Sequence, residues 1–141
     1  MIKIKEDIIR NIEKIFKNIL IDLKLKFKEC ILDKKKYIIT CRYEGEEYDL
    51  EFIYEKYDLF LYIIVKKNRY PFEITSLSAF IENDYSLTEE TKDLSIEEQL
   101  IKYKNLIEKY KKRLTENIRN QKFYNDYIFF LRERMKKYVE E

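Results

Sequence analysis

The sequence predicts an α+β fold with an N-terminal helix, an antiparallel β-meander of about four strands, and two to three C-terminal helices. Three patterns support this prediction. Apolar residues first recur at helical spacing, then alternate with polar residues from about position 23 to 65, and afterwards return to helical spacing. A chain of 141 residues suits one domain, 1–141, and this chain shows no internal repeat.

The first helix is expected to run from about Glu6 to about Leu20. One of its faces is apolar and the other carries mostly Lys, Glu and Asn, so the helix should bury a single stripe. This stripe consists of Ile8, Ile12, Ile15, Phe16 and Ile19.

Alternation with a period of two then predicts four strands, near 23–28, 37–43, 47–54 and 59–65. Lysines at alternate positions give the first strand one wet face, whereas the fourth strand is apolar on both faces. The only glycine, Gly45, can take the first position of a type II′ hairpin turn.

Two assumed turns, at 45–46 and 56–57, set the expected register. Core residues then face core residues across the strands, as a buried face requires. The first turn pairs Tyr43 with Tyr48, Cys41 with Leu50, Ile39 with Phe52 and Tyr37 with Tyr54, and the second pairs Leu59 with Tyr54, Leu61 with Phe52, Ile63 with Leu50 and Val65 with Tyr48. Two opposite-charge pairs result on the outer face, Arg42 with Asp49 and Glu47 with Lys66.

After Pro71 the pattern becomes helical again. A short helix should begin at a cap formed by Thr75 or Ser76 and end near Glu82. The polar stretch 83–93 is expected to be a loop.

A long helix should come next, because Ser95 and Glu98 form a capping box. Its stripe consists of Ile96, Leu100, Tyr103, Ile107, Tyr110 and Leu114. The stripe from 96 to 114 can form a coiled-coil homodimer or pack on the sheet, and its short length favours the sheet. After a break between 117 and 125, a last helix carries Tyr124, Tyr127, Ile128, Leu131, Met135 and Tyr138.

The composition disfavours most catalytic and cofactor sites. The chain has no His, one Gly and two Cys, so it lacks the commonest general base, a phosphate-cradling glycine loop and a Cys/His zinc site. Asp22, Asp49 and Glu51 superficially resemble the acidic strand motifs of metal-dependent nucleases, but simple alternation also explains the last two. We therefore expect no enzyme activity, no cofactor and no metal.

Cys30 and Cys41 are expected to be thiols. Cys41 has the same parity as Ile39, on the core side, whereas Cys30 has the same parity as Lys28, on the wet side. If the first strand has no bulge, the two cysteines therefore point to opposite faces of the sheet. We see no secretion signal and no apolar run of the roughly 20 residues that a membrane span needs. These features predict a cytosolic protein that does not enter a membrane.

Charge is unevenly distributed, although the net charge is only +2. The range 44–58 holds seven acids against one Lys, and the range 102–122 holds eight bases against two acids. Lys109 to Lys122 can contact phosphates, but no nucleic-acid module accompanies them. A solvated helix face is the simpler explanation, so nucleic acid is not the expected partner.

The outer face of the meander is the candidate binding site. It should carry large apolar side chains beside acids, and such a face is covered either by a helix of the same chain or by a partner. The candidate partner-binding residues are Glu47, Asp49, Glu51, Phe60, Tyr62 and Ile64, with Ile38, Ile53 and Arg42 on the same face. Acids at the rim and aromatic groups at the centre suit a protein with a basic rim.

Three runs carry a resemblance to a known class of proteins: 48–58 (YDLEFIYEKYD), 61–65 (LYIIV) and 130–134 (FLRER). With the order helix, antiparallel strands and helices, the chain resembles the small immunity proteins that neutralise bacterial polymorphic toxins. The resemblance implies a non-enzymatic inhibitor that occludes a cognate toxin stoichiometrically. It transfers no functional residue, because such families diverge widely.

Two other functions stay open. One is a phage or mobile-element inhibitor of a host defence complex, which differs from an immunity protein by its neighbouring gene and not by any residue. The other is a nucleic-acid-associated or nuclease-like protein, which heparin retention or metal-dependent cleavage would indicate.

Overall fold

The computed structural model describes residues 2–84 and 94–140, the side chains of 137–140 excepted. Along the chain the elements are α1 (Ile2–Ile15), α2 (Lys17–Asp22), β1 (Lys26–Asp33), β2 (Ile38–Glu44), β3 (Tyr48–Glu55), β4 (Asp58–Val65), β5 (Tyr70–Glu73), α3 (Ile74–Glu82), α4 (Ile96–Asn117) and α5 (Gln121–Glu140). The strands form one antiparallel sheet in the order β1-β2-β3-β4-β5. The predicted α+β class is confirmed, with a meander of five strands in place of four.

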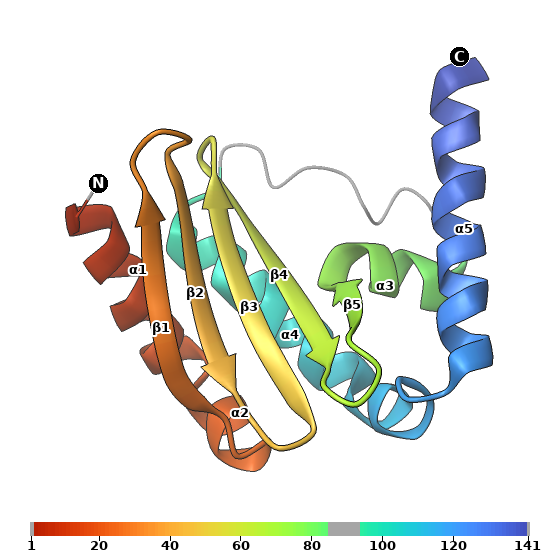
Figure 1. Cartoon of the computed structure of the whole chain (residues 1–141), viewed down its shortest axis with the longest axis horizontal. Coiled ribbons are helices and arrows are strands. Elements are labelled where there is room, and N and C mark those ends of the chain that lie inside the picture. The colour runs from red at the N-terminus through yellow and green to blue at the C-terminus, as the bar shows by residue number, and fades with distance from the viewer. Residues whose placement is uncertain (1, 85–93, 141) are drawn as a thin grey trace.

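The helices lie on one face of the sheet and beside its β5 edge. Figure 1 shows α1, α2 and α4 behind the sheet, and α3 and α5 next to β5. The sheet face toward α1 and α4 is here called the inner face, and the opposite face the outer face. Inner-face residues such as Leu50 and Leu61 are fully buried together with the stripes of α1 and α4, so the core lies between these layers.

The N-terminal helix bends at Phe16. α1 ends at Ile15 and α2 begins at Lys17, where one continuous helix was predicted. Helical hydrogen bonds still join the two, since the Phe16 amide donates to Ile12 and the Leu20 amide donates to Phe16. The bend keeps the predicted stripe on the core, because Ile12 and Phe16 are both buried.

A β-bulge between Phe27 and Glu29 corrects the prediction for the cysteines. The extra residue reverses the parity of the rest of β1, so Cys30 lies directly opposite Cys41 with 4.0 Å between their Cα atoms. The two residues form a disulfide, whereas thiols on opposite faces were predicted. The prediction was wrong because it assumed an unbulged strand.

The predicted register is correct for one hairpin and wrong for the other. β3 and β4 pair as predicted, with Tyr48 opposite Val65 and Tyr54 opposite Leu59. β2 and β3 are shifted by two residues, so that Tyr54 faces Ile39. Because the shift is even, the inner and outer faces keep their residues.

Gly45 lies just before the observed turn and not within it. It does not have a positive φ, so it does not serve a type II′ turn. A Cβ at this position would lie 2.8 Å from Leu25 Cδ2 and 2.8 Å from the Tyr48 carbonyl oxygen. The Gly45 amide donates to the Tyr48 carbonyl at 3.0 Å, so the two-residue turn is 46–47, one position later than predicted. Glycine is required at position 45 by close packing, which a turn rule based on φ does not consider.

The short strand β5 was not predicted, because it has four residues and contains Pro71. Pro71 is tolerated in this edge strand, where one side of the strand forms no ladder. Glu73 then caps α3, since its carboxylate accepts hydrogen bonds from the amides of Thr75 and Ser76. The predicted cap at Thr75 or Ser76 was therefore two or three residues late.

α4 begins at the predicted capping box, where Ser95 Oγ accepts from the Glu98 amide at 3.1 Å. The stripe packs on the inner face, and its residues Leu100, Tyr103, Ile107, Tyr110 and Leu114 are buried. This packing occupies the stripe from 96 to 114 that was considered for a homodimer. Of the predicted loop 83–93, residues 85–93 lie outside the described residues.

α5 is attached to β5 and α3 by aromatic rings. Tyr127 and Phe130 are buried, and Tyr124 stacks on Tyr70 with 4.1 Å between ring centroids. The predicted stripe leaves the core toward its end, where the exposed fraction of Met135 is 68%. The predicted break is confirmed, because α4 ends at Asn117 and α5 begins at Gln121.

Candidate functional site

The outer face of the sheet is not covered by any helix that the structure describes (Figure 1). Along β3 and β4, buried inner residues alternate strictly with partly exposed outer ones. This alternation is typical of an antiparallel sheet with one face packed and one face open. The described helices therefore do not supply the cover that the apolar outer side chains require.

Cross-strand pairing arranges the outer face in rows. The apolar row joins four strands and consists of Ile31, Thr40, Ile53 and Phe60. Ile31 is 53% exposed and the other three are partly exposed. A continuous band of this kind crosses the sheet where a partner can reach it.

The acidic row lies next to the apolar row and consists of Glu29, Arg42, Glu51, Tyr62 and Glu73. Arg42 is shared between two carboxylates, with 3.4 Å from Nη1 to Glu29 and 3.4 Å from Nε to Glu51. Arg42 thus faces Glu51 and not the predicted Asp49. Because the Glu73 carboxylate caps α3, the open part of this row holds two carboxylates against one guanidinium and is negative.

Tyr62 lies in the acidic row on β4, two residues after Phe60 of the apolar row. Burial among its neighbours raises the pKa of its hydroxyl, and the charges of Glu73, Glu51 and Glu55 raise that pKa further. The phenol is therefore neutral and can donate a hydrogen bond. A partly buried tyrosine with a polar tip among carboxylates suits a contact residue better than a core residue.

The third row, called the end row, consists of Glu44, Asp49, Ile64 and Pro71. Lys66 neutralises its carboxylates, with Nζ 2.7 Å from Glu44 and 3.9 Å from Asp49. The hydrogen bond from Lys66, followed by the charge of Lys28, lowers the pKa of Glu44. This end of the face is therefore closer to neutral than the acidic row.

Five of the six predicted site residues meet on the outer face: Asp49, Glu51, Phe60, Tyr62 and Ile64. Glu47 does not join them. Its carbonyl accepts from the Lys66 amide at 3.0 Å, as the register predicts, but its carboxylate pairs with Arg119 beyond α4. The predicted side-chain pair between Glu47 and Lys66 is therefore wrong.

Sequence reasoning missed six residues of the rows: Glu29, Ile31, Thr40, Glu44, Pro71 and Glu73. The bulge moves the first two onto the outer face, and the alternation in β1 carried no sign of it. Glu73 was missed with β5. Thr40 has the correct parity and was passed over because it is polar.

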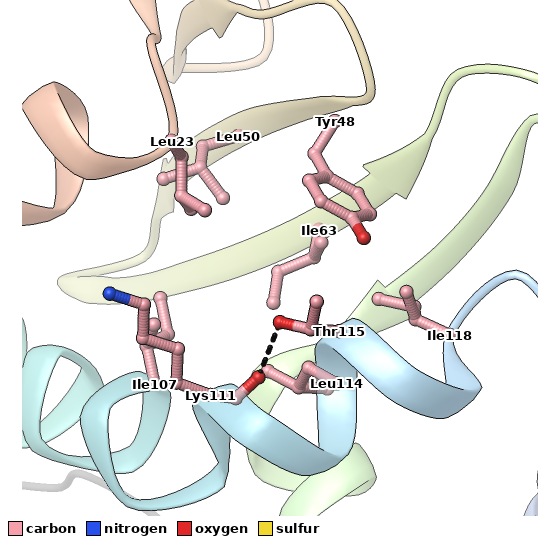
Figure 2. Close-up of a pocket in the computed structure, with 9 residues that line it drawn as sticks. All are labelled: Leu23, Tyr48, Leu50, Ile63, Ile107, Lys111, Leu114, Thr115 and Ile118. Atoms are coloured by element: carbon pink, nitrogen blue, oxygen red, sulfur yellow. Dashed lines mark hydrogen bonds between the residues drawn. The ribbon is translucent and has the colours of Figure 1, made fainter.

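A small apolar pocket lies on the inner side, between the sheet and α4 (Figure 2). It is lined by Leu23, Tyr48, Leu50, Ile63, Ile107, Lys111, Leu114, Thr115 and Ile118. In Figure 2 the apolar side chains point into the space, and the Thr115 hydroxyl donates to the Lys111 carbonyl at 2.8 Å. A volume of about 30 Å³ holds only a water-sized group, so this pocket is a packing gap.

Within the described ranges, no three His, Cys, Asp or Glu residues come together to hold a metal ion. Over the same residues, no helix combines the length and apolar character that crossing a bilayer requires. Comparison of the chain with protein-family models, curated proteins and solved structures gives no match.

Proposed function

We propose that the protein is a non-enzymatic inhibitor that binds another protein through the outer face of its sheet. The supporting observation is the apolar row, which crosses four strands without a described helix above it. Apolar bands on open faces are typical of interaction sites, since water solvates them poorly. An immunity-type protein, which occludes a toxin stoichiometrically, is the kind of inhibitor we expect.

The rows suggest what the partner surface looks like. An apolar strip should lie over Ile53 and Phe60, and basic side chains should face Glu29 and Glu51. Charge pairs of this kind accelerate encounter, whereas the buried apolar centre slows dissociation.

The size of the face sets a further requirement. Four strands about 4.8 Å apart, with about eight residues at 3.3 Å each, present roughly 500 Å². Each partner in a standard interface contributes about 800 Å². We therefore expect the partner to reach past the rows to an edge or an end of the sheet.

We further propose that the protein acts in the cytosol. A disulfide is uncommon in that compartment, so we expect Cys30 and Cys41 to be reduced there. Backbone pairs flank the bond on both sides, Glu29 with Arg42 and Ile31 with Thr40, so we expect the strands to stay paired after reduction.

The test is affinity capture from an extract of the source cells, with the protein as bait. The wild type should capture one protein, and so should a control variant, Lys112→Gln, at an exposed position of α4. The Ile53→Asp variant should fail to capture that protein. That protein should then bind the purified wild type with 1:1 stoichiometry. Equal recovery by Ile53→Asp would place the interface elsewhere.

A further inference from the structure

Two neighbouring hairpin turns carry the same dipeptide. The β1–β2 turn contains Lys36-Tyr37 and the β3–β4 turn consists of Lys56-Tyr57. Both turns lie at the same end of the sheet (Figure 1). β2 begins directly after the first dipeptide and pairs with β3, which ends directly before the second. We name these two dipeptides the Lys–Tyr tips.

The tips present rings and charges to solvent. Tyr37 is 66% exposed and Tyr57 is 84% exposed. Lys34, Lys35, Lys36 and Lys56 are also exposed, and none of them forms an ion pair with a residue in the described part of the chain. Lys28 and Lys66, near the other end of the sheet, are by contrast both paired with Glu44.

Side chains hold both tips in place. Asp33 Oδ1 accepts from the amides of Lys35 and Lys36 at 3.0 and 3.1 Å. Gln99 is fully buried, accepts from the Leu59 amide at 2.8 Å and donates to the Tyr57 carbonyl at 3.4 Å. The exposed rings therefore project from an ordered backbone.

The residue types at the tips do not serve stability. Tyr37, Lys56 and Tyr57 have φ values of 57°, 51° and 69°, which suit Gly or Asn. Two consecutive positive φ values are characteristic of a type I′ turn, in which Asn-Gly is the favoured sequence. Lys24 and Arg69 have positive φ values as well, so the feature that distinguishes the tips is their exposed rings.

We propose that the Lys–Tyr tips form a binding site for single-stranded nucleic acid. Bases stack on exposed aromatic rings whatever their sequence, and ammonium groups contact the backbone phosphates. Tyr37 and Tyr57 stand on turns at the same end of the sheet, so each can stack on a base of one bound strand. This site goes beyond the proposed function, because it uses neither the apolar row nor the acidic row.

A single strand fits the tips better than an acidic protein does. The tips carry tyrosine rings and lysines but no aliphatic side chain, so they offer little of the apolar centre that a stable protein interface needs. Stacking needs only an exposed ring face and a nearby cation, and both are present. An acidic protein would form ion pairs with the lysines but would not stack on the tyrosine rings.

The test is fluorescence anisotropy with labelled dT12 and rU12 at 50 and 200 mM salt. The wild type should bind, and Tyr37→Ala and Tyr57→Ala should each weaken binding about tenfold or more. Lys36→Gln with Lys56→Gln should lower the slope of log affinity against log salt by about 1.4, since a phosphate contact in a single strand contributes about 0.7.

The control is Lys109→Gln with Lys112→Gln, which removes two exposed charges from α4. This control removes as many charges as the tip variant, so it should weaken binding less than the tip variant does if the tips are the site. If it abolishes binding while the tip variants bind normally, the basic helix is the site and the proposal is wrong. Absence of binding at 50 mM salt would also overturn the proposal. So would displacement of dT12 by an equal concentration of poly-glutamate, if poly-glutamate binds the wild type and the Tyr variants equally well.

Discussion

Exchange of Phe60 or Leu61 for aspartate tests directly whether the outer face is open. The two residues are neighbours on β4 and point to opposite faces of the sheet. Leu61 is fully buried in the core, whereas Phe60 is partly exposed in the apolar row. The same substitution therefore meets two environments at one position along the sheet.

The expected magnitudes differ widely. Removing the Leu61 side chain costs about 2–5 kcal/mol, and an unpaired carboxylate in the core adds several more. The total approaches the roughly 5–15 kcal/mol that stabilise a domain of this size. Phe60→Asp loses only its cross-strand contact with Ile53 and part of its burial, about 1 kcal/mol or slightly more.

Thermal and urea unfolding monitored by circular dichroism measure the stability of both variants. We expect Leu61→Asp to be unfolded in buffer and Phe60→Asp to melt within about 5 °C of the wild type. A Phe60→Asp variant as unstable as Leu61→Asp would show that the same chain covers the outer face. The proposed interface would then be wrong.

Three further predictions concern the turns and the disulfide. The double substitution Lys56→Asn with Tyr57→Gly should raise the free energy of unfolding by about 1 kcal/mol, because Asn and Gly suit the positive φ values at these positions. An unchanged urea midpoint would contradict this. Reduction of the Cys30–Cys41 disulfide, which spans 11 residues, should lower that free energy by about 3 kcal/mol on the loop-entropy estimate, whereas a Cys30→Ser, Cys41→Ser variant should not respond to reductant. Gln99→Leu should cost about 1–3 kcal/mol, since it leaves a buried backbone amide without its acceptor, and amide hydrogen exchange at the β3–β4 turn should rise.

The sequence predicted those elements whose signals are local. The capping box at Ser95 and the apolar stripe after it located α4, and a two-residue turn located β3 against β4. Alternation placed Phe60 and Tyr62 on the outer face, since face assignment needs only parity. The candidate site was therefore accessible before any register was known.

The remaining features depend on tertiary contacts. The bulge near Lys28 shifts β1 by one residue, and no residue type in that strand marks it. Gly45 is needed because Leu25 and the Tyr48 carbonyl approach it, which a turn rule does not consider. Both errors arise from packing between segments that are separate in the sequence.

The most direct test of the proposed function is calorimetric titration of the captured partner into the wild type and into Phe60→Asp. We expect one binding site per chain for the wild type and an affinity at least about 100-fold lower for the variant, because a charge then faces the apolar centre of the interface. Phe60→Asp should still be folded in the same buffer. An unchanged affinity for this folded variant would contradict the assignment of the outer face as the inhibitory surface.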